Sequence, residues 1–516
     1  MLLRDRDIPQ RKYKINGFRR ISQFTMMLVL FTGISCDSFL DEVPDNRVAL
    51  DDLEKASQLL TNAYSASSYA FTDWMTDNVG FTRGVNLRPN HIEAYSWEDF
   101  TGDPNNQDTP TFYWFQSYNA IAHANEVLAV LEDLPATTTE LEERKDAVES
   151  EALLTRAYAH FMLVNLFGNH YDESSASNDP GVPYIETPET VFIGQYERNT
   201  VQEVYDKVEE DMLRGIALVN DNFFLNSGKY HFNKNAALAF ASRFYLFKGD
   251  WNKCIEYSDQ MLGSDPAAFI RDFTSEEFRA ASSSIQGYPQ LYSSPELPSN
   301  LMLIRKSSLV QRTDFAHSPT NTIYSNLFAA HPFTGIIDDR ENPSFVKGVN
   351  GSFPVRYESL FQRSGLNSNT GFPYHIALAF RGEEVLLNRV EAYIRTGRIS
   401  DAIADLQVLT DNRYRITTAG GNRTLSMTLI RNFYGVGGNP FIRDEVVLME
   451  YYLLEKQKEF IMQGMRWFDI KRFDISVRHV LGDEVTVITL EEDDKRKVFQ
   501  IPQTAIDVGG LNPNPR

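Results

Sequence analysis

Apolar residues recur every three or four positions through much of the chain, a spacing that predicts amphipathic α-helices. The predicted helices cover residues 51–67, 112–134, 146–168 and 200–219. The third stops at Gly168, a suitable C-cap residue. The fourth begins at Thr200 with Glu203 three residues later, the spacing of a capping box. Most of the strongly periodic sequence is therefore predicted to be helical.

Two further periodic segments predict helical hairpins of one design, over residues 236–262 and 383–409. When they are aligned on Gly249 and Gly397, their apolar positions coincide, and Cys254 matches Ala402. The arrangement resembles a tetratricopeptide repeat, in which two antiparallel helices meet at small residues. Cys254 is therefore expected to be a small buried core residue.

Two segments lack this periodicity, residues 68–111 and 264–378. Both are rich in Ser, Pro, Asn, Gly and aromatic residues. Loops of this length in a helical scaffold are usually functional or disordered. Their aromatic content argues against disorder, so we expect these segments to carry a binding face.

The amino end has the two parts of a secretory signal. A basic stretch ends at Arg20, and an apolar run covers residues 24–34. This run is shorter than the ~20 apolar residues of a membrane-spanning helix, and it fits a signal h-region of roughly 7–15 residues. We therefore expect residues 1–35 to be a lipoprotein signal peptide.

Cys36 follows that apolar run directly, in a stretch that resembles a bacterial lipobox. Gly33 stands where such motifs usually have Leu. The resemblance implies cleavage before Cys36 and lipid attachment to its thiol. The alternatives are an ordinary cysteine near a cut signal peptide, or a disulfide with Cys254. The disulfide is disfavoured because Cys254 already fits a hairpin core.

Composition and charge narrow the class of protein. A hydrophobic content of 42% and an aromatic content of 12% suit a well-cored globular protein. Beyond residue 35 the chain has 43 basic and 68 acidic residues, a net charge of −25. Such a surface repels phosphate backbones, so we expect no nucleic-acid partner.

The sequence contains none of the common catalytic or metal-binding motifs: H-E-x-x-H, C-x-x-C, G-x-S-x-G, a P-loop or a dinucleotide fingerprint. Acidic pairs occur at Glu383–Glu384 and Asp338–Asp339. A glycosidase needs two carboxylates at a set distance, which sequence alone does not show. We expect no enzyme and no cofactor. "GDPNNQD" (102–108) offers oxygen ligands for Ca²⁺ without the spacing of a calcium loop, and a plain turn is the alternative.

The segment 454–474, "LEKQKEFIMQGMRWFDIKRFD", closely resembles the signature of the SusD/RagB family, surface lipoproteins of Bacteroidota. The matching residues are Glu455, Glu459, Phe460, Gly464, Arg466, Trp467, Asp469, Ile470 and Arg472, while Gln463 replaces a usual Glu. Further family landmarks occur in order along the chain at 75–79, 118–128, 151–168, 338–340, 380–394, 499–506 and 511–516. The resemblance covers essentially the whole mature chain.

The signature itself is expected to be structural. Arg466, Asp469 and Arg472 follow helical spacing, which predicts ion pairs that lock the segment to the scaffold. Trp467 and Phe468 are expected to fill the core.

The resemblance implies both a fold and a role. The fold is mainly α, a tetratricopeptide-like helical hairpin scaffold with long ligand-binding loops. Its regions are an N-terminal 36–225 and a C-terminal 226–516, which includes the loop-rich 264–378. The implied role is to bind a glycan at the outer face of the cell outer membrane, where the protein is lipid-anchored. It then delivers this ligand to a SusC-like TonB-dependent transporter.

Ligand contacts are expected in the loops, because sugar rings stack on aromatic faces and their hydroxyls need polar partners. Trp97 is the first candidate, since it lies between polar neighbours and is expected to be exposed. The other candidates are Tyr95, Arg83, Trp74, Tyr292 and Tyr288. Each aromatic residue could instead anchor the packing of its loop. Two alternative functions stay open: peptide binding, as in the RagB branch, and a transporter assembly or lid subunit without a ligand site.

Overall fold

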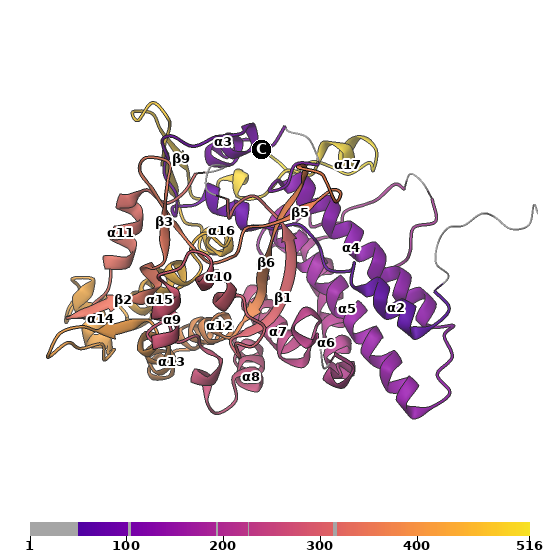
Figure 1. Cartoon of the computed structure of the whole chain (residues 1–516), viewed down its shortest axis with the longest axis horizontal. Helices are drawn as coiled ribbons and strands as arrows, with labels where there is room; N and C mark the ends of the chain where they lie inside the picture. Colours follow the sequence, from indigo (N-terminus) through magenta and orange to yellow (C-terminus); the bar gives the residue numbers. More distant parts are fainter. Residues whose placement is uncertain (1–49, 102–104, 192–193, 225–226, 313–316) are drawn as a thin grey trace, which may run out of the picture. The chain divides into compact units, whose positions relative to one another are not determined.

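Threonine side chains cap three long helices, α4 (Pro110–Leu131), α5 (Thr139–Phe167) and α6 (Val201–Leu218). In this computed structural model, Thr109, Thr138 and Thr200 each accept a hydrogen bond from the backbone N–H three residues later. Glu203 completes the predicted capping box at α6. The three helices pack side by side (Figure 1). The structure describes residues 50–101, 105–191, 194–224, 227–312 and 317–516.

The first helix is shorter than the range 51–67 that its apolar pattern predicts. The helix α2 (Leu53–Leu60) ends at Leu60, before the predicted limit at 67. Beyond it the chain runs into the core, where the Tyr64 hydroxyl donates to the Glu151 carboxylate and Ser67 pairs with Ser307. These tertiary contacts override the local helical pattern.

The two predicted hairpins are confirmed. They consist of α7 (Lys234–Lys248) with α8 (Trp251–Leu262), and α12 (Gly382–Arg395) with α13 (Ile399–Asp411). Gly249 and Gly397 turn the chain with φ of 79° and 74°, the left-handed region that glycine adopts readily. Helix α8 packs on α12, and the Cys254 thiol lies fully buried against the Asn388 carbonyl. Burial raises the pKa of Cys254 to about 12, so this thiol is an inert core group.

A small antiparallel sheet lies inside the segment that was expected to be loop-rich. Its strands are β1 (Asn300–Ser307), β6 (Gly371–Arg381) and β5 (Leu360–Arg363), in the order β1-β6-β5. Leu303 of β1 pairs with Leu378 of β6, and Met302 and Phe380 are also fully buried. The continuously buried stretches of these strands, residues 300–304 and 378–381, show no apolar–polar alternation, so the sequence pattern did not predict them.

The remaining α-helices and paired strands lie along the rest of the described chain. The helices are α3 (Pro89–Ser96), α9 (Glu276–Ala281), α10 (Gly287–Tyr292), α11 (Asn321–Ala329), α14 (Met427–Phe433), α15 (Asp444–Glu459), α16 (Met465–Arg472) and α17 (Gln503–Asp507). The paired strands are β2 (Ile336–Asp338) with β7 (Tyr414–Ile416), β3 (Ser344–Lys347) with β4 (Gly351–Pro354), and β8 (Val477–Val480) with β9 (Val487–Leu490).

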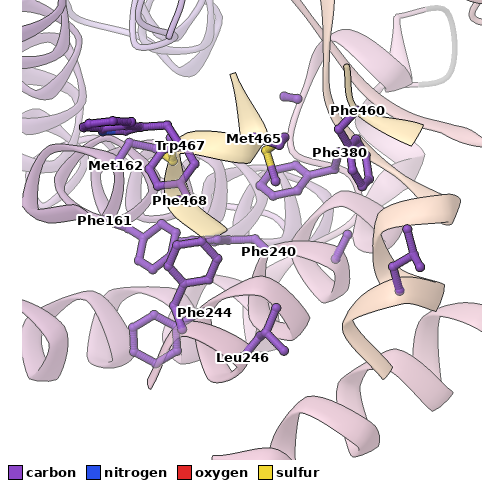
Figure 2. Close-up of a cluster of buried hydrophobic side chains, with 14 of the residues drawn as sticks. Phe161, Met162, Phe240, Phe244, Leu246, Phe380, Phe460, Met465, Trp467 and Phe468 are labelled. Atoms are coloured by element: carbon purple, nitrogen blue, oxygen red, sulfur yellow. The ribbon is translucent and has the colours of Figure 1, made fainter. Parts of the chain in front are cut away.

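The signature segment forms α15 and α16, and it is structural as predicted. Arg466 pairs with Asp77, Asp469 with Lys456, and Arg472 with Glu391, at 2.7, 2.6 and 2.6 Å. Trp467 and Phe468 are buried at 0% and 3% exposure. Figure 2 shows both rings in one cluster with Phe161, Phe240 and Phe244. The signature thus fixes the C-terminal segment to the helical scaffold.

A buried ion-pair network joins the other landmark motifs to this segment. Arg340 pairs with both Asp338 and Glu455, at 2.7 and 2.8 Å. Arg413 contacts Glu459 at 2.8 Å and Glu383 at 3.4 Å. All six side chains are at most 2% exposed. Such pairs hold position well because removing one partner leaves a buried charge uncompensated.

Residues 50–516 form one compact unit. The boundary near 225 falls between α6 and α7, which pack against each other within this unit. The predicted signal peptide and Cys36 lie outside the described residues. Among the residues that are described, no helix has the length and apolar character needed to cross a bilayer.

Candidate functional site

Three of the aromatic candidates lie together in the core. Tyr95 and Trp97 are 3% exposed and Trp74 is 0% exposed. His479 stacks on both Tyr95 and Trp97, with ring centroids 4.1 and 4.5 Å apart, while Trp74 contacts His91 edge-on at 4.5 Å. The expectation that Trp97 is exposed is therefore wrong. A ring of this size buries about 150–250 Å², which makes it an effective packing anchor even in a loop.

Tyr288 and Tyr292 lie in a separate buried cluster with Phe273, Phe278 and Tyr357. Their rings stack at 6.0 Å, and the Tyr292 hydroxyl accepts a hydrogen bond from Arg381. The structure therefore does not bring these two residues together with Trp97. All five aromatic candidates therefore pack inside the fold, as the alternative interpretation expected. Direct contact of these residues with a ligand stays a prediction.

Arg83 differs from the other candidates because its side chain is 54% exposed. Its guanidinium lies 3.5 Å from the Glu484 carboxylate on the turn between β8 and β9. Its backbone bonds to Asn350 and Val349 on the turn between β3 and β4. Arg83 thus connects two hairpin tips and is not grouped with the aromatic candidates.

One of the aromatic candidates, Trp97, lines an open cleft of 410 Å³. One wall is formed by residues 97–101, directly after α3, and the opposite wall by residues 496–504 with Arg516. Pro110 and Thr111, at the start of α4, close a third side. In Figure 1, α3 and α17 lie at the same end of the described unit, close to the carboxyl terminus.

The first wall is fixed by the way α3 ends. Trp97 caps the helix in a left-handed conformation (φ 55°, ψ 32°), which is uncommon for a bulky residue. The conformation turns the indole inward, where its Nε1 donates to the Met75 carbonyl at 2.8 Å. Thr101 is held from the same helix, since its N–H and hydroxyl both donate to Glu93. The wall is therefore pre-formed.

Charged groups of both signs face each other across the cleft. Arg516 donates to Asp99 from two nitrogens, at 3.0 and 2.6 Å. Arg496 donates to Asp494 at 2.6 Å, and its guanidinium lies 5.9 Å from the Trp97 ring. The hydrogen bond that Arg496 donates to Asp494 raises the pKa of Arg496, so the guanidinium stays charged.

The floor and rim of the cleft differ in polarity. Phe100 is half-buried against Phe71 and Phe499, at 6.1 and 6.4 Å. Gln503, Glu98 and Thr101 are exposed at the rim. A partly apolar floor beneath a rim of hydrogen-bond donors and acceptors suits a ligand that has both C–H faces and hydroxyl groups.

Sequence reasoning missed half of this cleft. Arg496, Gln503 and Arg516 are separated from Trp97 by about 400 positions, and no local pattern pairs them. The one available signal was the landmark stretch 499–506, "FQIPQTAI", which places exposed polar residues around a proline. It identified the family without indicating that the stretch faces residues 97–101.

The acidic pairs noted in the sequence are engaged elsewhere. Glu383 pairs with Arg271, Glu384 with Arg243, and Asp339 with Arg415. Within the described ranges, no group of three or more His, Cys, Asp or Glu side chains is arranged to hold a metal ion. Part of the stretch 102–108 lies outside those ranges, and a bound Ca²⁺ there stays a prediction. Asp108 is buried and accepts hydrogen bonds from Ser308 and Leu309.

A helical hairpin scaffold that carries a pre-formed polar and aromatic cleft defines a ligand-binding protein. Family models agree with this class: one described as "Starch-binding associating with outer membrane" matches residues 38–246, and the SusD family model matches residues 362–509. The chain belongs to the SusD/RagB family.

Known proteins of this family resemble the chain over most of its length. SusD-like protein P38 of Formosa agariphila is 22% identical, with 90% of this chain and 93% of that protein covered. A SusD superfamily structure from Bacteroides thetaiotaomicron superposes with a TM-score of 0.64 at 17% identity, covering 90% and 100% of the two chains. A laminarin-binding SusD-like protein does so with a TM-score of 0.56 at 16% identity, covering 90% and 98%. The mainly helical, tetratricopeptide-like fold is thus confirmed as the SusD fold.

Proposed function

We propose that this protein is a glycan-binding lipoprotein of the outer-membrane surface, which captures an oligosaccharide and delivers it to a SusC-like TonB-dependent transporter. The observation that carries the binding role is the 410 Å³ cleft, in which aromatic edges lie beneath a charged and polar rim. A matching family model described as starch-binding and a similar structure described as laminarin-binding support a glycan as the ligand class. The protein binds and does not hydrolyse its ligand.

The cleft binds a sugar by two complementary contacts. Phe100 and the edge of Trp97 offer apolar surface to a C–H face. Arg496, Asp99 and Gln503 offer donors and acceptors to hydroxyl groups. Hydrogen bonds to charged groups contribute about 1.5–3 kcal/mol each, enough for one residue to change affinity tenfold or more.

Isothermal titration tests this role, with maltohexaose and laminarihexaose as probes. Arg496→Ala is expected to weaken binding of the preferred probe by about tenfold, or ~1.4 kcal/mol. Arg415→Ala is the matched control, because Arg415 also pairs with an aspartate, Asp339, but does not line the cleft. Equal affinities of the two variants would contradict the assignment of the cleft.

A peptide is the second candidate ligand, favoured by one observation. The Asp99–Arg516 pair presents both signs of charge at the cleft, which suits the two termini of a short peptide. Titration with a mixture of dipeptides and tripeptides distinguishes the two classes. Binding of peptides without binding of either hexaose would replace the glycan proposal. Binding of neither, with retention of a transporter partner, would favour an assembly or lid subunit.

The anchor and the transporter partner rest on the sequence and the family. Cys36→Ala is expected to release the protein from membranes and to abolish incorporation of labelled fatty acid. Three acyl chains would exceed the two signals that stable anchoring requires. Affinity purification from detergent-solubilised outer membranes is expected to recover a TonB-dependent transporter. Unchanged labelling of the variant, or purification of the protein alone, would contradict the respective proposal.

A further inference from the structure

A second hollow lies beside the cleft, on the same side of the scaffold. Its volume is 360 Å³, and it lies between α4, residues 183–189 with 194–196, and the segment 504–511. Its aromatic lining residues are Trp114, Phe115, Tyr118 and Tyr196. It is thus large enough for a ligand group and richer in aromatic rings than the cleft itself.

We propose that this hollow is a second glycan subsite that binds the continuation of the chain held in the cleft. The ligand class is then a linear oligosaccharide that occupies both hollows. The inference rests on the proposed function, because it takes the cleft as the first subsite.

The two hollows share their walls. Thr504 lines both, with Gln503 on the cleft side and Ala505 and Val508 on the other. On α4, Thr111 lines the cleft, and Phe115 and Tyr118 line the hollow. These α4 positions recur at intervals of four and three residues, so they lie on one helix face. The cleft and the hollow therefore form one trough between α4 and α17.

The length of the trough indicates the length of the ligand. Thr111 and Tyr118 are seven residues apart, a rise of about 10 Å along the helix. A single sugar ring is too short to occupy both ends of the trough. A linear oligosaccharide that runs along α4 is long enough to do so.

The chemistry of the hollow suits sugar stacking. Phe115 is 39% exposed at the mouth, while Trp114 is 3% exposed and packs against Tyr118 at 4.9 Å. The Tyr118 hydroxyl donates to the Pro183 carbonyl at 2.8 Å, which fixes the angle of that ring. The Tyr196 hydroxyl donates to Glu189. The rings offer apolar faces, and the Glu189 carboxylate offers an acceptor for hydroxyl groups.

The outer wall is also held in place before any ligand arrives. Gln195 donates from its amide to the Val508 carbonyl at 2.9 Å, and the Tyr196 N–H donates to Gly509 at 3.0 Å. Arg198 donates to the Asn512 carbonyl at 3.1 Å. These contacts attach the segment 504–512 to the segment 194–198, so the trough requires little ordering on binding.

The test is the dependence of affinity on chain length. Maltose-series and laminari-series oligosaccharides of two to eight units are titrated into the full chain and into the double variant Phe115→Ala/Tyr196→Ala. Wild-type affinity is expected to rise with length until both subsites are filled. The double variant is expected to bind the disaccharide as wild type does and to lose about tenfold on the hexaose, which flattens the length dependence.

Phe441→Ala serves as the control, since Phe441 is 93% exposed and lines neither hollow. Urea denaturation of each variant checks that the fold is intact. A double variant with the wild-type length dependence, or with equal losses at every length, would overturn the second subsite and leave the cleft assigned. If the wild type binds no member of either series, the proposed function fails, and the second subsite fails with it.

Discussion

Trp97 has three contacts that hold it in place, and together they make it part of the fold. Its indole donates to the Met75 carbonyl, its ring stacks on His479, and its backbone caps α3 in a left-handed conformation. The ring edge reaches the cleft, although only 3% of the residue is exposed. At this position, loss of stability and loss of ligand contact are coupled.

Trp97→Ala is therefore expected to lower the free energy of unfolding by about 3–5 kcal/mol, the cost typical of a large buried aromatic residue. Urea denaturation measures this change. In contrast, Phe441→Ala removes a ring that is 93% exposed and is expected to change stability by less than about 0.5 kcal/mol. A Trp97 variant as stable as the control would show that the ring serves the ligand and not the core.

Single residues also show what the sequence could and could not predict. Cys254 was predicted to be a core residue because its neighbours followed a helical repeat, and it is fully buried. Trp97 was expected to be exposed because its neighbours Ser96 and Glu98 are polar. At the end of a short helix, two polar neighbours establish no periodicity, so they do not indicate on which side a ring lies.

At the scale of elements, the junction between α15 and α16 depends on one glycine. Gly464 has φ of 85°, and a Cβ at this position would lie 2.5 Å from the Tyr69 carbonyl oxygen. The carbonyl belongs to a backbone segment packed against α16, so it has little freedom to move. Any residue other than glycine is thus disfavoured at this position, both by the backbone conformation and by the steric clash of its Cβ with the Tyr69 carbonyl.

Gly464→Ala is expected to destabilise the protein by more than Gly435→Ala. Gly435 also has a positive φ, 68°, but a Cβ there meets nothing within 4 Å. The second variant therefore measures the conformational cost alone, of order 1 kcal/mol. The excess in Gly464→Ala, expected to be about 2 kcal/mol or more, reports the clash. If the two variants had equal midpoints and slopes in urea denaturation, this would contradict the close approach of Gly464 to the Tyr69 carbonyl.

Elements with a strong period were predictable, and sites between elements were not. The helices α4, α5 and α6 and both hairpins follow from apolar spacing and capping residues. The strands β1 and β6 do not, because their continuously buried stretches, residues 300–304 and 378–381, lack apolar–polar alternation. The cleft joins residues 97–101 to residues 496–504, and its second half became visible only in three dimensions.

At the scale of the whole molecule, the large core includes two lysines without a carboxylate partner. Within the described part of the chain, neither Lys306 nor Lys471 lies within ion-pair distance of an acidic side chain. Lys471 donates to the carbonyls of Asn165 and Gly168, and Lys306 donates to that of Ser65. Burial lowers the pKa of each to about 7.

These lysines predict how stability changes with pH. An unfolded lysine keeps its proton up to about pH 10.4, whereas each of these lysines loses it near pH 7 in the folded state. From pH 7 upward, the unfolded state therefore binds more protons, so stability rises with pH. Two such groups give a slope that approaches ~2.7 kcal/mol per pH unit between pH 7 and 8.5. Above that range, the cysteine thiol begins to ionise in the unfolded state, whereas Cys254 stays protonated in the folded state. This difference opposes the rise in stability with pH.

Urea denaturation at pH 7.0, 7.5, 8.0 and 8.5 measures this slope. Lys471→Met keeps most of the apolar stem and is expected to remove about half of the slope, since one of two titrating groups is lost. Lys248→Met is the control, because Lys248 lies near the surface and pairs with a carboxylate, Glu209. A slope that Lys471→Met leaves unchanged would mean that this ammonium stays charged in the folded protein, held by the two carbonyls at the end of α5.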